Sequence, residues 1–187
     1  MCIRDSSKRE PGHKFLEFLY IEWLLMQHPF ASFPEKKPQL PGQRFPGLRI
    51  GNHVLEILYN TAKKIHTCGL ANSPNYLHTA IIFSKEFKFI DPAKEAVAQA
   101  AKGYLLKRYS LWTLAWAAVH GAIYHLKDHS PLLWESSPMV LPISDELKNY
   151  FNSRWYREQY RKHKDEIRVG IDLELLQKKI NTASGLH

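Results

Sequence analysis

Residues 45–64, FPGLRIGNHVLEILYNTAKK, lead from a proline and two glycines into a segment with an apolar face. Its apolar side chains recur at the spacing of a helix that lies on a core: Val54, Leu55, Leu58, Ala62 and Ile65. Gly47 and Gly51 leave the backbone open where this helix begins, and the unpaired N–H groups there can hold an anion such as a pyrophosphate. The alternative is that Gly47 belongs to a simple turn and Gly51 is a close-packing position.

Strand and helix patterns alternate around this helix. Residues 15–26, FLEFLYIEWLLM, are apolar and aromatic, and we expect a central strand over about Leu19 to Met26, with a helix as the competing interpretation. Residues 68–74 predict a short buried strand, residues 77–87 a helix and residues 87–90 another short strand. The order strand, glycine turn, helix, strand, helix, strand predicts an α/β fold.

In this order the residues resemble the GNAT N-acyltransferase superfamily. In that family a strand leads to an R/Q-G-x-G/A-type turn and a helix that hold acyl-CoA, and a later N-x-x-A-x-x-L-Y-x-K-x-G-F-like segment closes the site. Here residues 46–51 (PGLRIG) stand at the turn and residues 80–89 (AIIFSKEFKF) at the closing segment. The chain departs from the pattern at three positions: Arg49 replaces a small residue, Ser84 a tyrosine and Lys88 a glycine.

The resemblance implies a partial GNAT-like mixed sheet and acyl-CoA-dependent N-acyl transfer, with acetyl-CoA or another acyl-CoA as donor and an unidentified amine or small-molecule acceptor. It implies that the turn holds the pyrophosphate and that N–H groups of the preceding strand polarise the thioester carbonyl. The implied cofactor-binding residues are Leu24, Leu25, Met26, Gly47, Leu48, Arg49, Ile50, Gly51 and Asn52. Ser84 would give a proton to the leaving thiolate, a role for which serine is poorly suited, so a catalytically degenerate domain is an alternative.

Further polar residues flank this expected cofactor site. Glu22 interrupts the apolar strand, where a carboxylate could take a proton from the attacking amine; its alternative is an ordinary surface glutamate. Asn72, Asn75, Tyr76 and His78 follow the second strand, at the end where α/β sheets bind ligands, and they predict a substrate rim. The alternative is turn and cap chemistry, with Asn75 capping the next helix.

Residues 28–47 contain five of the eleven prolines, so they form neither a helix nor a central strand. They predict either a lid over the cleft or an ordered wrap on the surface.

The second half of the chain predicts helices. Cap residues mark their starts: Asp91 before a helix through Leu106, Ser110 before one through Leu126, Ser144 before one through about Lys164, and a last helix over residues 173–180. We expect residues 14–91 to form the partial α/β core and residues 92–187 a mostly helical extension packed on it. Residues 148–164 alternate basic and aromatic side chains, which either bind nucleic acid or form a solvated basic face over aromatic stems.

Composition limits the classes of function. A chain of 187 residues with 44% hydrophobic residues predicts one globular domain. The formal charge of +8 favours an anionic partner, whether nucleic acid, an acidic surface or a phosphorylated cofactor. We expect no membrane span, no secretion signal and no disulfide framework, so a cytoplasmic location follows, and we predict no metal site.

The first six residues, MCIRDS, match the translated end of a common sequencing adapter. We therefore expect residues 1–13 to be an artefact or disordered start and the chain to be a fragment. Beside the N-acyltransferase interpretation stand a non-catalytic cofactor-sensing or interaction module and, third, a nucleic-acid-binding protein that uses the basic aromatic helix.

Overall fold

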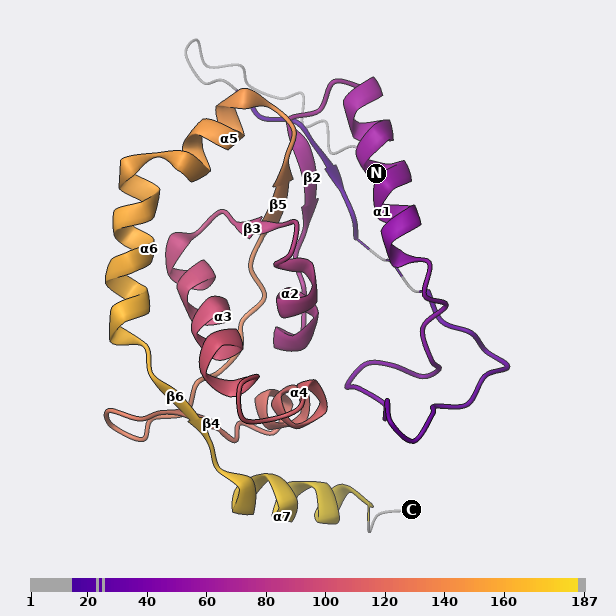
Figure 1. Cartoon of the computed structure of the whole chain (residues 1–187), viewed down its shortest axis with the longest axis vertical. Coiled ribbons are helices and arrows are strands. Elements are labelled where there is room, and N and C mark those ends of the chain that lie inside the picture. Colours follow the sequence, from indigo (N-terminus) through magenta and orange to yellow (C-terminus); the bar gives the residue numbers. More distant parts are fainter. Residues whose placement is uncertain (1–14, 23, 25, 185–187) are drawn as a thin grey trace, which may run out of the picture.

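The computed structural model describes residues 15–22, 24 and 26–184. In these residues the elements follow in the order β1 (Phe18–Tyr20), α1 (Gly51–Lys64), β2 (Gly69–Asn72), α2 (Leu77–Phe83), β3 (Lys88–Phe89), α3 (Pro92–Leu105), α4 (Leu111–Val119), β4 (Ile123–His125), β5 (Met139–Pro142), α5 (Asp145–Asn152), α6 (Arg154–Glu166), β6 (Val169–Ile171) and α7 (Leu173–Ser184) (Figure 1). The expected α/β class is confirmed.

Four strands form the main sheet in the order β1-β2-β5-β3, and β4 pairs with β6 in a separate two-stranded sheet. β1 and β2 run parallel, with Leu19 opposite Leu70, and α1 connects them. β5 runs antiparallel to both of its neighbours, β2 and β3. Because β5 comes from the second half of the chain, the main sheet takes strands from both sides of the expected boundary at residue 91.

The sheet is covered on both faces, because its side chains alternate. Leu70 and Met139 face α1 and α2, where they pack with Ala62 and Ala80. The neighbouring strand residues, Ala71 and Val140, face the opposite side. There they pack with Leu147 and Phe151 of α5 and with Tyr156 of α6. Figure 1 shows α1 on one side of the strands and α6 far on the other.

The first strand differs from its prediction. We expected a central strand over about Leu19 to Met26, whereas β1 is a three-residue edge strand of the described sheet. The ladder to β2 ends one residue later, where the Ile21 N–H donates to the carbonyl of Ala71 at 2.7 Å. Gln27 pairs instead with Gly47, far along the chain, as an isolated antiparallel bridge.

One predicted helix ends early and another is divided in two. The helix expected through Leu126 ends at Val119, because Gly121 takes a left-handed φ of 65° and the chain continues into β4. The helix expected from Ser144 to Lys164 is broken at Ser153, whose extended backbone (φ −63°, ψ 151°) ends α5 and begins α6. Of the helices in the described part of the chain, none is long and apolar enough to span a membrane.

Candidate functional site

The glycine turn before α1 is held against the chain that follows β1. The His28 N–H donates to the Pro46 carbonyl at 2.7 Å, and the Leu48 N–H donates to the Met26 carbonyl at 3.0 Å. These bonds fix the turn, and they also occupy the N–H of Leu48, one of the residues expected to bind the pyrophosphate. Leu25, another of the expected residues, lies outside the described residues.

Arg49 adopts a backbone conformation that suits glycine. Its φ is 63°, in the left-handed region where the backbone of any residue other than glycine is strained. This is the position at which the family resemblance expects a small residue. The side chain of Arg49 is exposed.

The start of α1 has backbone N–H groups that the helix itself leaves unpaired. Its first backbone bond runs from the Val54 N–H to the Ile50 carbonyl at 3.1 Å, so the N–H groups of Gly51, Asn52 and His53 have no partner within the helix. Ile50 is the N-cap residue, no side chain of the described residues caps the helix, and its first turn carries no acidic residue. By contrast, side chains cap the four helices α3, α4, α5 and α6.

The packing of the chain does not require glycine at either turn position. A Cβ at Gly47 would meet the Met26 carbonyl oxygen at 3.7 Å, and a Cβ at Gly51 would meet the Met26 Cε at 3.5 Å, both ordinary contacts. Close packing therefore does not account for Gly51. Small residues here leave the backbone accessible from outside.

The predicted substrate rim forms the turn from β2 to α2. Asn72 and His78 are each 4% exposed. Among the described residues, the side-chain nitrogen and oxygen of Asn72 have no hydrogen-bond partner, and the Nδ1 of His78 has none either. Burial lowers the pKa of His78 to about 4, because the charged imidazolium is poorly solvated there. The ring of Tyr76 stacks on His78, with 5.3 Å between the ring centroids.

Asn75 is exposed and is not the cap of α2. The N-cap residue is Tyr76, and no side chain in the described part of the chain makes a cap hydrogen bond. The alternative of ordinary cap chemistry at Asn75 is therefore wrong.

The two expected catalytic residues follow different elements, β1 and α2. Glu22 is exposed in the segment after β1. Ser84 is the C-cap of α2, at the opposite end of that helix from His78. Its hydroxyl donates to the Ile81 carbonyl at 2.8 Å and accepts from the Lys102 Nζ at 3.3 Å.

The proline-rich segment contacts the aromatic residues around the rim, a feature that the sequence did not reveal. The Trp116 Nε1–H donates to the Gln39 carbonyl at 3.2 Å. Pro41 is buried, and Gly42 packs so closely on Tyr76 that an added Cβ would lie 2.6 Å from the ring carbon Cε2. Figure 1 shows this segment looping out from the sheet and back to α1, with its innermost part near α4.

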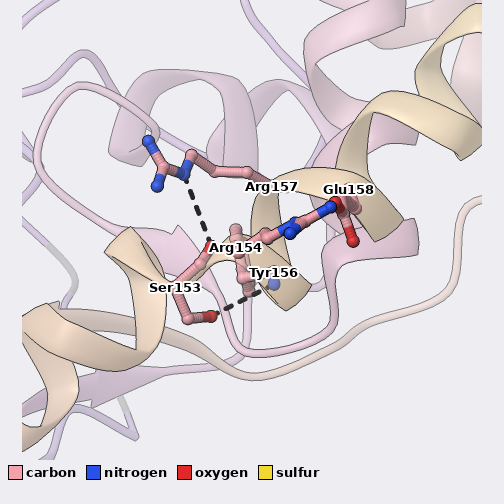
Figure 2. Close-up of polar contacts among 5 residues, drawn as sticks. All are labelled: Ser153, Arg154, Tyr156, Arg157 and Glu158. Atoms are coloured by element: carbon pink, nitrogen blue, oxygen red, sulfur yellow. Dashed lines mark hydrogen bonds and ion pairs between the residues drawn. The ribbon is translucent and has the colours of Figure 1, made fainter.

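Two arginines of the basic helix α6 bond to groups at the start of that helix or within it. Figure 2 shows that the Ser153 hydroxyl accepts from the Tyr156 N–H and that the Arg157 Nε–H donates to the Ser153 carbonyl, at 3.1 and 3.4 Å. Arg154 pairs with Glu158 at 2.6 Å. Tyr156 is buried, and its hydroxyl donates to the Phe89 carbonyl at 2.7 Å. Tyr156 is therefore an aromatic stem beneath the charged surface.

Comparison with known proteins finds no matching family model, no similar curated protein and no similar solved structure.

Proposed function

We propose that the chain binds an acyl-CoA through the start of α1 and belongs to an N-acyltransferase-like enzyme. The observation that carries the proposal is the uncapped start of α1, where the N–H groups of Gly51, Asn52 and His53 are unpartnered in the helix. Such a start attracts phosphate, because its N–H groups and the helix dipole both favour negative charge.

The topology supports the same proposal. β1 and β2 are parallel and α1 connects them, so the start of α1 lies at the carboxyl ends of both strands. Ligands of open α/β sheets bind at this end. Of the rim residues, Asn72 ends β2 and Tyr76 and His78 follow it, so a cofactor on α1 and an acceptor on the rim would be neighbours.

A non-catalytic cofactor-binding module is the second candidate. Ser84 favours it, because its hydroxyl proton is engaged by the Ile81 carbonyl and its oxygen by Lys102. A hydroxyl held in this way is a weak proton donor to a thiolate. The two candidates share the cofactor site and differ only in turnover.

Calorimetry with CoA tests the cofactor site. We expect Gly47→Asp to weaken CoA binding at least tenfold, because a carboxylate would face the phosphates. The matched control is Gly103→Asp, which adds the same charge at an exposed position in α3 where a Cβ meets nothing within 4 Å. Equal CoA affinity in the parent and Gly47→Asp would remove the turn from the proposal. Acyl transfer to a panel of amines then separates an enzyme from a cofactor-binding module.

A further inference from the structure

The turn after β2 buries polar groups that the described protein leaves unsatisfied. Asn72 ends β2, and His78 is the second residue of α2. Both side chains are 4% exposed, and the Asn72 amide and the His78 Nδ1 lack partners among the described residues. Buried polar groups without partners are unfavourable, so most of them in folded proteins are hydrogen-bonded. A ligand can supply the missing bonds.

Residues 39–42 contact the aromatic neighbours of two histidines. Gln39 accepts from Trp116, whose ring stacks on His120 with 5.6 Å between centroids. Gly42 packs on Tyr76, whose ring stacks on His78. Three residues span at most about 11 Å, so the two contacts are close together. The preceding residues 34–38 are exposed.

The unsatisfied groups fit an uncharged ligand. The Asn72 side chain offers two N–H donors and one carbonyl acceptor, and an imidazole nitrogen can donate or accept according to its tautomer. Neither group carries a charge that could compensate a buried ion, and burying an uncompensated ion is strongly unfavourable. An amide group matches this set, because it also has both a donor and an acceptor.

We propose that Asn72 and His78 form the floor of a binding site for an uncharged amide group, and that residues 39–42 are its roof, which shifts to admit the ligand. Identifying this ligand as the acyl acceptor rests on the proposed function, and it makes the acceptor an amine that also carries an amide. The binding site itself does not depend on acyl transfer.

Three probes of similar size and different charge test the ligand class: acetamide, acetate and ethylammonium. The readout is the imidazole NMR signals of His78 in the ¹⁵N-histidine-labelled full chain, assigned with His78→Gln. We expect acetamide to shift these signals saturably and to bind at least tenfold more tightly than either ion. Asn72→Leu should abolish the acetamide response and leave the chain folded. Equal or tighter binding of an ion, no response to acetamide, or an unchanged response in Asn72→Leu overturns the proposal.

Two glycine variants test the roof. Gly42→Ala should alter acetamide affinity at least threefold and shift the His78 signals, because its Cβ would clash with Tyr76. Gly121→Ala is the matched control, because Gly121 has a similar φ of 65°, against 77° for Gly42, but a Cβ there meets nothing within 4 Å. If both variants bind acetamide as the parent does, residues 39–42 are not the roof.

The acetamide and CoA experiments fail independently. If the parent chain binds acetamide but not CoA, the proposed function is wrong and the amide site stands. CoA binding without any acetamide response removes the amide site alone.

Discussion

At the scale of single residues, Arg49 stands where the resemblance expects a small residue, and its backbone has a left-handed conformation that suits glycine. We predict that Arg49→Gly raises the free energy of unfolding by up to about 1 kcal/mol, because glycine relieves the strain of the 63° φ. We also predict that it binds CoA at least as tightly as the parent, because the long side chain no longer obstructs the turn. Urea unfolding and calorimetry measure the two effects.

His66 offers the control for Arg49. It is exposed and has a φ of 59°, just after the other end of α1. His66→Gly should give the same gain in stability with no change in CoA affinity. If Arg49→Gly instead weakens CoA binding by about 1–3 kcal/mol, the guanidinium is a phosphate ligand.

The buried imidazole of His78 predicts a pH-dependent stability. Its pKa is lowered from 6.5 to about 4, so between these values the unfolded chain binds a proton that the folded chain does not. The contribution of the neutral His78 imidazole to the free energy of unfolding is fully present above pH 6.5. It is lost as the pH falls, by up to about 3 kcal/mol near pH 4. Urea unfolding of the parent and of His78→Gln from pH 7 to pH 4.5 measures it. A parent and variant that lose stability equally over this range would assign the effect to other groups.

At the scale of elements, Gly69 in β2 is required by the sheet. A Cβ there would lie 2.6 Å from the Leu141 carbonyl oxygen, a backbone atom of β5. We predict that Gly69→Ala lowers the free energy of unfolding by about 2–4 kcal/mol, because the β2–β5 ladder must separate to accommodate the methyl group. Thermal and urea unfolding measure the change.

Gly103 provides the opposite case for the same substitution. It is exposed within α3, and a Cβ there meets nothing within 4 Å. Gly103→Ala should therefore raise the free energy of unfolding by about 0.5–1 kcal/mol through the higher helix propensity of alanine. A Gly69→Ala chain as stable as Gly103→Ala would show that β5 lies elsewhere.

The sequence correctly predicted the helix starts that depend on neighbouring residues alone. The caps at Asp91, Ser110 and Ser144 are confirmed, because each depends on residues within one turn of the helix. The strand β4 was predicted as helix, because its partner β6 lies far along the chain and only the fold supplies it. The break at Ser153 was missed, since serine fits both a helix interior and a cap.

The candidate site was predictable to a similar extent. The strand end and the helix start that follow one another in sequence placed Asn72 and His78 at one turn. Their burial and lack of partners depend on packing that no local pattern encodes. The contact between Gln39 and Trp116 joins residues 77 positions apart, so the roof could not be inferred from the chain.

At the scale of the whole molecule, the +8 charge gives a prediction for nucleic acids. We expect only weak, non-specific binding, because α6 pairs Arg154 with Glu158 and buries Tyr156 against β3. Fluorescence titration of a labelled duplex and a labelled single strand should show affinity that falls steeply between low and physiological salt. Tight, sequence-selective binding at physiological salt would make nucleic-acid recognition the leading function.

The position of β5 between β2 and β3 also determines when the sheet can form during synthesis. β2 and β3 leave the ribosome well before residues 139–142, and at about 5–20 residues per second the delay is roughly 3–14 s. Throughout that interval the edges of β2 and β3 that β5 will cover are unpaired, and the buried residues Leu70 and Phe89 are exposed. A nascent-chain chaperone that binds extended apolar segments therefore has several seconds in which to protect this protein.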